Sequence, residues 1–331
     1  MKKVTALLLV LMLVFSLAGC TEAPAVVPEQ EKTPTLVRVS ALKGPTGMGM
    51  AGLMRDADKG VTANDYEFTL ASAPDDITGS IISGNVDIAA VPTNLASVIY
   101  NKTKGGVKLL ALNTLGVLYI LEDGESVSSI ADLKGKTVYA SGQGATPEYA
   151  LNYILDKNGL KPGVDLTVEY KSEHSELATM IISDMADIVL LPEPFVTTVM
   201  MKKNTVRKAI DITAEWDAAS AGKSALSMGC LVVSSEFAEK NPEAVDAFLK
   251  EYAASVNFVN TEVDEAAALI AEYGIVASAY IAKKAIPSCN IVCITGDEMK
   301  NATGGFLQVL FDSNPVSVGG KMPEDDFYYG S

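Results

Sequence analysis

Four short polar turns hold the residues of this sequence that could contact a small molecule. Residues 44–49 and 141–146 are rich in glycine, and each follows an apolar stretch and precedes a helix-like one. Glycine lets a backbone approach a ligand closely, and free amides at a helix start attract negative charge. Pro92-Thr93-Asn94 and Pro192-Glu193-Pro194 end two further apolar stretches, because proline stops a strand.

We expect ligand contacts from Thr46, Gly47, Met48, Thr93, Asn94, Asn113, Gln143, Gly144, Ala145, Thr146 and Glu193. Glu193 is the only carboxylate of the four turns, and Asn113 interrupts an apolar stretch. Each group also has a structural alternative. The glycine turns would then be ordinary strand-to-helix turns, Thr93 and Asn94 would cap a helix, and Glu193 would accept a structural hydrogen bond.

The same inventory argues against catalysis. His174 is the only histidine, it lies in a polar helix start where we expect it to be exposed, and no serine, cysteine or carboxylate can be tied to it by spacing. Residues 141–146 are not a dinucleotide-binding fingerprint, because Pro147 stands where a third glycine is needed. We therefore predict that the protein is not an enzyme and has no catalytic residue, metal site or cofactor.

Charge and length set the broad class. The chain has 331 residues, with 26 lysines and arginines against 41 aspartates and glutamates, so its net charge is −15 at pH 7. An acidic surface without a basic stripe repels phosphate backbones, and we do not expect nucleic-acid binding. The length suggests two domains or lobes rather than one.

The start of the chain is expected to be an export signal and a tether. Two lysines precede the uncharged run 4–17, which is too short to span a bilayer and is typical of a secretory signal. Leu17-Ala18-Gly19-Cys20 resembles a bacterial lipobox, which implies cleavage before Cys20 and its lipidation (palmitate). We predict a signal peptide over residues 1–19 and a flexible tether over 20–35, with the protein anchored in the cell membrane on its extracytoplasmic face. A short buried helix that ends in a cysteine by chance is the alternative.

Three cysteines remain in the body of the chain, Cys230, Cys289 and Cys293. An odd number is unusual in an oxidising compartment. A local disulfide between Cys289 and Cys293 and burial of all three as small apolar residues are both open.

An internal repeat with an offset of one hundred residues organises the rest. Ile81-Ile82-Ser83, Asp87-Ile88 and Pro92 recur as Ile181-Ile182-Ser183, Asp187-Ile188 and Pro192. An apolar run, a glycine turn and a helical stretch recur upstream in the same register. This alternation predicts an α/β fold of two βαβ lobes joined by two hinge crossings. We expect lobe I over 36–115 and 224–331, and lobe II over 116–223.

Several motifs resemble the solute-binding proteins of ABC transporters, of the nitrate/sulfonate/taurine and thiamine-pyrimidine-precursor type. They are Asp132-Leu133-Lys134-Gly135-Lys136-Thr137-Val138, the turn 142–146, Glu193-Pro194-Phe195 and the helix opening at 237–245. The resemblance covers roughly residues 35–328. It implies the type II periplasmic-binding-protein architecture and a monomer that closes around a small solute. The solute would be delivered to an ABC permease, whose ATPase is a separate subunit.

Two other functions stay open. One is a surface lipoprotein that senses a ligand without transport. The other is an enzyme similar to the fungal thiamine-pyrimidine synthase, a fold relative that uses a histidine and a cysteine-rich motif. No arginine lies in the candidate turns, so a bidentate clamp for a carboxylate or sulfonate is not expected. We expect a neutral or zwitterionic solute, such as a pyrimidine-like nutrient, with a sulfonate such as taurine as the second choice.

Overall fold

The computed structural model describes residues 33–72 and 74–330. The chain divides into two units, Met1–Thr33 and Pro34–Ser331, and everything below concerns the second. The predicted signal peptide and Cys20 lie outside the described residues. Among the residues that are described, no helix combines the length and the apolar character needed to cross a membrane.

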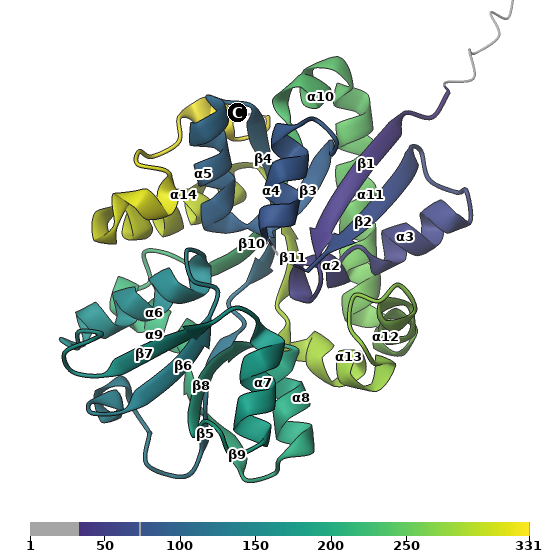
Figure 1. Cartoon of the computed structure of the whole chain (residues 1–331). Helices are drawn as coiled ribbons and strands as arrows, with labels where there is room; N and C mark the ends of the chain where they lie inside the picture. Colours follow the sequence, from purple (N-terminus) through teal and green to yellow (C-terminus); the bar gives the residue numbers. More distant parts are fainter. Residues whose placement is uncertain (1–32, 73, 331) are drawn as a thin grey trace, which may run out of the picture. The chain divides into compact units, whose positions relative to one another are not determined.

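Two mixed sheets form the frame of this unit (Figure 1). The six-stranded sheet has the order β11 (Ile291–Ile294), β4 (Val107–Leu115), β10 (Ser227–Ser234), β3 (Ile88–Pro92), β1 (Leu36–Leu42) and β2 (Asp65–Ala71). The five-stranded sheet has the order β7 (Thr167–Lys171), β6 (Thr137–Ser141), β8 (Ile188–Pro192), β5 (Leu118–Asp123) and β9 (Val206–Asp211). Each sheet contains three parallel strands. In the six-stranded sheet β1 runs parallel to β2 and β3, and in the five-stranded sheet β6 runs parallel to β7 and β8.

Helices cover both faces of each sheet, so the central strands are buried on two sides. The six-stranded sheet packs α4 (Pro74–Ile82), α5 (Thr93–Thr103) and α14 (Gly296–Ser313) on one face. It packs α3 (Ala51–Asp58), α11 (Pro242–Thr261), α12 (Val263–Glu272) and α13 (Ala279–Ala285) on the other. The five-stranded sheet lies between α6 (Thr146–Lys157) with α9 (Ile212–Ser220) and α7 (His174–Ile182) with α8 (Phe195–Lys202). The shorter helices are α2 (Pro45–Met48), α10 (Ser235–Lys240), η1 (Ile130–Leu133), η2 (Ile286–Ser288), η3 (Pro315–Val318) and η4 (Asp325–Phe327).

The repeat in the sequence corresponds to repeated structure. The helices α4 and α7 and the strands β3 and β8 occupy positions one hundred residues apart. Every residue of β3 and β8 is buried, which accounts for their uninterrupted apolar sequences. Each strand ends at a proline. After β3, α5 begins directly at Thr93, and after β8, Glu193 and Pro194 lead into α8.

The helical stretch expected after the first glycine turn is two helices in the structure. They are α2 and α3, separated at Gly49 and Met50. A Cβ at Gly49 would lie 2.6 Å from the hydroxyl of Tyr252 on α11, so only glycine lets the chain approach α11 this closely. The break between α2 and α3 therefore allows the backbone at Gly49 to pack closely against α11.

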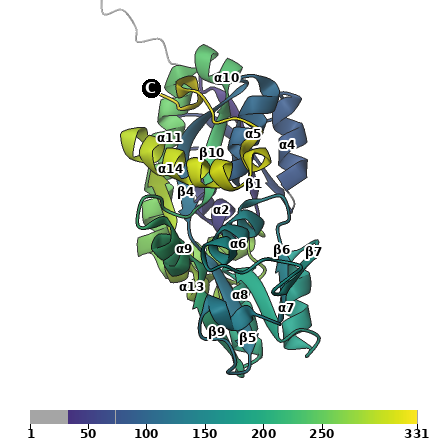
Figure 2. The same cartoon turned by 90° about the vertical axis from the view of Figure 1, so that its left-hand side faces the viewer.

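The chain passes between the sheets twice, at Gly116 and Val117 and again between Ser220 and Ser227. One apolar cluster continues across both sheets on the face that carries α5, α6, α9 and α14. Within it, the Trp216 ring of α9 lies 5.5 Å from Phe306 of α14 and 4.9 Å from Tyr153 of α6. Figure 2 shows α14 beside α6 and α9 on this side. On the opposite faces, each sheet has a separate cluster.

Candidate functional site

The start of α5, directly after β3, contacts the turn after β6 and the start of α6, and this contact joins the two halves of the unit at the ends of their strands. Asn94, in the first turn of α5, is fully buried. Its side-chain oxygen accepts a hydrogen bond from the Thr146 hydroxyl (3.2 Å), and its amide nitrogen donates to the Ser317 carbonyl (3.1 Å) and, at 3.5 Å, to the Gly144 carbonyl. The structure thus brings together three of the predicted ligand residues.

Thr93 lies one residue before Asn94 and is also buried. Its hydroxyl is 2.8 Å from that of Ser227, the first residue of β10. The two hydroxyls form a pair on the six-stranded sheet, where the chain has just returned from the other sheet. Ser227 was not among the predicted site residues, because nothing in the local sequence indicates that β10 pairs with β3.

The turn after β1 is built for close packing. Thr46 donates through its hydroxyl to the Leu42 carbonyl (3.3 Å), and its own carbonyl accepts from the Asn113 side chain (3.1 Å). A Cβ at Gly47 would lie 2.5 Å from the Leu42 carbonyl oxygen, so this glycine is a steric requirement of the turn. Met48 is fully buried within the core cluster around α11, so its side chain packs inside the six-stranded half.

Asn113 is buried on β4 beside this turn. Besides donating to Thr46, it accepts from the hydroxyl of Thr114 (3.1 Å). A Cβ at Gly229 would lie 2.5 Å from the Thr46 side chain and 2.6 Å from the Asn113 oxygen. The glycine on β10 therefore leaves room for both polar side chains.

The turn after β6 borders a pocket of about 370 Å³. The pocket is lined from one sheet by the loops after β6 and β7 and from the other by Leu95 of α5 and Asp75 of α4: Asp75, Leu95, Gly142, Gln143, Gly144, Ala145, Tyr170, Lys171 and Ser172. Gln143 and Gly144 are exposed. Gly144 has a φ of +77°, and its amide donates to Glu148 (2.6 Å). The hydroxyl of Tyr170 is buried, with no hydrogen-bond partner among the described residues.

The strand ends at this pocket are the carboxyl ends of parallel strands, where α/β sheets bind their ligands. The helices α5, α6 and α7 begin there, and the residues before them, Pro92, Ala145 and Glu173, make no side-chain capping hydrogen bond. Helix N-termini with uncapped amides favour hydrogen-bond acceptors and negative charge.

Of the eleven predicted ligand residues, only Gln143, Gly144 and Ala145 line this pocket. Glu193 is buried (1% exposed), and both of its carboxylate oxygens already have partners. One accepts from the Lys208 ammonium (3.1 Å) and the other from the Thr197 amide in the first turn of α8 (3.0 Å). Lys208 also lies over the Tyr119 ring, 3.9 Å from its centroid. The structure thus gives Glu193 the structural hydrogen bonds that were its alternative role.

The expectation that His174 is exposed is wrong. Its ring is half-buried, its Nδ1 lies 2.5 Å from the Ser141 hydroxyl, and its centroid is 5.5 Å from that of Phe195. Burial lowers the pKa of His174 to about 4, against an opposing effect of the Glu173 charge. The contact between Ser141 and His174 could have been inferred from their positions in the sequence. Ser141 ends one strand, and His174 begins the helix after the next strand.

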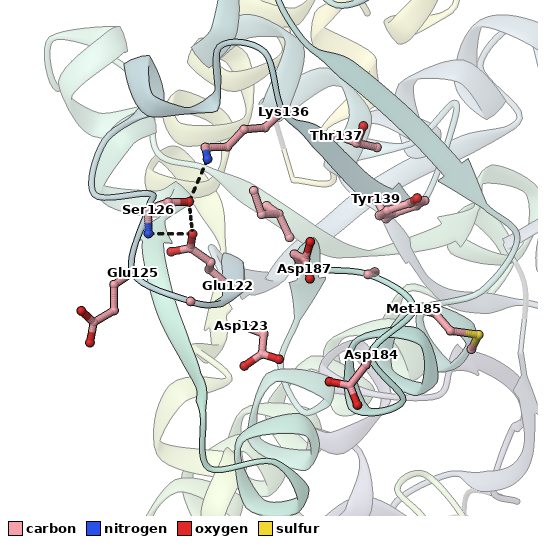
Figure 3. Close-up of a pocket in the computed structure, with 13 residues that line it drawn as sticks. Glu122, Asp123, Glu125, Ser126, Lys136, Thr137, Tyr139, Asp184, Met185 and Asp187 are labelled. Atoms are coloured by element: carbon pink, nitrogen blue, oxygen red, sulfur yellow. Dashed lines mark hydrogen bonds between the residues drawn. The ribbon is translucent and has the colours of Figure 1, made fainter.

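A second pocket, of about 500 Å³, lies at the opposite end of the five-stranded sheet, by the first residues of β6 and β8 (Figure 3). Its carboxylates are Glu122, Asp123, Glu125, Asp184 and Asp187. Three of these five are paired, Asp123 and Asp184 with Lys203 and Glu122 with Arg207. None of the predicted ligand residues lines it. Within residues 33–72 and 74–330, no group of three or more histidine, cysteine or acidic side chains could hold a metal ion.

The three cysteines of the described chain are free. Cys230 and Cys289 are buried and Cys293 is half-buried. The structure thus matches burial as small residues rather than a Cys289–Cys293 disulfide. Burial raises the pKa of the Cys293 thiol to about 11, so it is protonated at neutral pH.

Comparisons with known proteins agree with this architecture. Residues 104–266 match the model of a family described as NMT1/THI5 like. A comparison with curated protein sequences finds no match. Among solved structures, the chain is similar to an ABC transporter protein from Parabacteroides distasonis, with 23% identity over 89% of this chain and 98% of that chain and a TM-score of 0.74.

Two sulfonate-binding proteins also share the fold. The periplasmic aliphatic sulphonate binding protein SsuA from Escherichia coli is 15% identical over 88% of this chain and 93% of that chain, with a TM-score of 0.69. The alkanesulfonate-binding protein SsuA from Xanthomonas axonopodis pv. citri, bound to MOPS, is 13% identical over 87% and 95%, with a TM-score of 0.68. The predicted type II periplasmic-binding-protein fold is confirmed.

Proposed function

We propose that this protein captures a small solute outside the cytoplasm and delivers it to the permease of an ABC importer. The observation that carries the proposal is the contact of Asn94 with Gly144 and Thr146, beside a pocket lined from both sheets. When a binding site is formed by both halves of a chain, a solute that contacts both halves favours the state in which the halves lie close together. The similar structures, of which two are named as sulfonate-binding proteins, support the same function.

The two halves would act as lobes, lobe I over residues 36–115 and 224–331 and lobe II over 116–223. A solute that touches both lobes stabilises the closed arrangement by its higher affinity for that state. On lobe I we assign solute contacts to the turn of Thr46 and to Thr93 and Asn94. On lobe II we assign them to the turn from Gln143 to Thr146. Asn113 would hold the turn of Thr46 in place through its hydrogen bond to the Thr46 carbonyl. Glu193 would hold the start of α8 against β9 through Thr197 and Lys208.

The geometry favours a solute with a negative or acceptor-rich group. The expectation of a neutral or zwitterionic solute relied on the absence of an arginine from the candidate turns and on Glu193 as a free carboxylate. The second reason no longer applies, because Lys208 and the Thr197 amide occupy the two oxygens of Glu193. The three uncapped helix starts instead offer amide donors at the strand ends. A sulfonate therefore becomes the first candidate for the solute and a pyrimidine-like nutrient the second.

Thermal unfolding with a panel of solutes tests the function. We would measure the melting temperature with taurine, ethanesulfonate, nitrate, cytosine and thiamine, for the parent and for Asn94→Ala. At a hundred times Kd, binding stabilises the native state by about 2.7 kcal/mol, which raises the melting temperature by several degrees. A matched control is Asp187→Asn, in the acidic pocket at the far end of the sheet.

The measured stabilities distinguish a solute site between the lobes from a site elsewhere. Stabilisation of the parent and of Asp187→Asn, with loss in Asn94→Ala, supports a site between the lobes. A crystal structure with the solute bound away from residues 93–94 and 143–146 would refute it. The runner-up function, ligand sensing without transport, predicts the same binding but no permease and ATPase genes beside this one.

We also propose that the protein works as a lipoprotein on the extracytoplasmic face of the cell membrane. The proposal is supported by the lysines, the apolar run and the lipobox-like sequence that ends at Cys20. A tether between the lipid and the folded unit would keep the solute site close to a permease.

A further inference from the structure

The only histidine of the chain, His174, and its partner Ser141 lie next to residues that line the candidate pocket, although they do not line it themselves. Ser141 is the last residue of β6, and the next residue, Gly142, lines the pocket. His174 begins α7, two residues after Ser172, which also lines the pocket. Because β6 and β7 are parallel neighbours, their carboxyl ends bring Ser141 and His174 together. Phe195, at the start of α8, packs against the imidazole.

Hydrogen bonding decides which ring nitrogen carries the proton. Ser141 is 1% exposed, and within the described chain its hydroxyl has no acceptor other than His174 Nδ1. A buried hydroxyl without an acceptor is costly, so the Ser141 hydroxyl donates to Nδ1. Nδ1 is then the acceptor, and in the neutral ring Nε2 bears the hydrogen.

The ring is held in this form by its surroundings. Burial lowers its pKa to about 4, although the negative charge of Glu173, the residue before it, acts in the opposite direction. The imidazole is therefore neutral at neutral pH. Nε2 has no hydrogen-bond partner within the described residues, although Ser141 and Phe195 fix the ring that carries it.

We propose that His174 is a solute-binding residue of lobe II, which donates a hydrogen bond from Nε2 to an acceptor atom of the solute, and that Ser141 positions it. This proposal rests on the proposed function. It requires the solute to present an oxygen or an unprotonated ring nitrogen to lobe II. An ammonium group on that side has no acceptor at His174, so the site discriminates by donor and acceptor pattern.

A solute-free measurement tests the Ser141–His174 pair on its own. Nitrogen-15 labelling of the single histidine gives one pair of ring signals, which report the tautomer and the pKa. We expect the Nε2–H tautomer with no titration between pH 8 and 6. In Ser141→Ala the tautomer preference should decrease, because the hydroxyl that selects it is gone. An Nδ1–H tautomer, or titration near pH 6.5 in the parent, would overturn the assignment.

A binding measurement tests the contact with the solute. With ethanesulfonate as the probe, His174→Leu should weaken binding about ten- to a hundredfold, the usual loss for a hydrogen bond to a charged group. His174→Gln retains a donor near the Nε2 position and should recover part of the affinity. Ser141→Ala should weaken binding less than His174→Leu, since it loosens the ring without removing the donor.

Each result separates this inference from the function on which it rests. If ethanesulfonate binds the parent and all three variants equally, His174 is not a contact, and solute binding stands. If only His174→Leu and His174→Gln lose binding, and both lose it equally, the ring acts by shape rather than by donation, which also refutes the proposal. If neither ethanesulfonate nor the rest of the panel stabilises the parent, the proposed function fails, and the contact at His174 fails with it.

Discussion

Arg38 donates three hydrogen bonds to the carboxylate of Asp87. Its backbone amide and its Nε donate to one carboxylate oxygen, both at 2.9 Å, and its Nη2 donates to the other at 2.6 Å. Asp87 is 6% exposed and begins the approach to β3. Its repeat counterpart, Asp187, is exposed and lines the acidic pocket instead. In sequence, the residue one hundred positions after Arg38 is Val138, so the repeat does not carry the arginine.

This difference gives a matched pair of variants. Asp87→Asn should lower the free energy of unfolding by roughly 1–3 kcal/mol, because the buried carboxylate loses the charge that accepts three hydrogen bonds from the partly exposed Arg38. Asp187→Asn, an identical change at the equivalent position, should change it by less than about 0.5 kcal/mol. Urea denaturation of the two variants checks this. Equal effects would show that the ion pair contributes nothing specific.

The Lys208–Glu193 pair predicts a coupled effect. Lys208→Met leaves the buried Glu193 carboxylate with only the Thr197 amide, so the variant should lose about 2–4 kcal/mol of stability. Adding Glu193→Gln should restore part of the loss, with a coupling energy of about 1–3 kcal/mol. The double-mutant cycle is measured by chemical denaturation. Additive effects would mean that the two residues do not interact in solution.

Phe306 should matter both for stability and for the environment of the only tryptophan. Phe306→Ala removes a fully buried ring beside Trp216, and we expect a loss of about 3–5 kcal/mol and a red shift of the tryptophan emission. Val316→Ala changes a side chain that is 72% exposed and is the control for both measurements. An unchanged emission maximum in Phe306→Ala would argue against the contact.

Acid should destabilise the protein partly through His174. Its pKa is about 4 in the folded state and about 6.5 in an unfolded chain. The folded state therefore disfavours the proton. The contribution of neutral His174 to stability is complete above pH 6.5 and is lost as the pH falls from 6.5 towards 4.

The free energy of unfolding measured across this range checks the prediction. In His174→Gln the curve should fall less steeply between pH 6.5 and 4 than in the parent, because the residue no longer titrates. Carboxylates that titrate below this range affect both proteins alike and cancel in the comparison. Parallel curves would show that His174 titrates normally in the folded state.

Changing Cys20 tests the predicted anchor. If the lipobox-like sequence is processed, Cys20→Ala should release the protein from the membrane fraction or leave it unprocessed at a higher mass. The measurement is cell fractionation followed by mass spectrometry of the mature chain. Cys293→Ala, a change in the folded unit, is the control and should fractionate like the parent. A Cys20→Ala protein that remains in the membrane at its mature mass would rule out the anchor.

The sequence predicted the repeated elements because their signals are local. An uninterrupted apolar run of five residues that ends in proline indicates β3 and β8, and the helices before them follow from the same register. Asn94 and Thr146 were named as ligand residues because each lies in the first turn of a helix, directly after a strand or a glycine turn. Their contact with a solute stays a prediction. These features depend only on neighbours in the chain.

The residues that were missed depend on strand order. Ser141 meets His174 because β7 lies beside β6, and Glu193 meets Lys208 because the chain continues from β8 through α8 to β9. Neither relationship has a fixed spacing in sequence. The polar side chain of Glu193 therefore looked available for a ligand, although its partners lie within its own half of the molecule.

The apolar cluster around Trp216 and Phe306 also constrains how the halves can part. It is one continuous layer across both sheets, whereas the clusters on the opposite faces are separate. Pulling the halves straight apart would expose this whole layer to water, but swinging them about it exposes little. We therefore expect any relative movement of the two halves to keep this layer buried, so that the layer acts as the hinge and is not broken when the halves move.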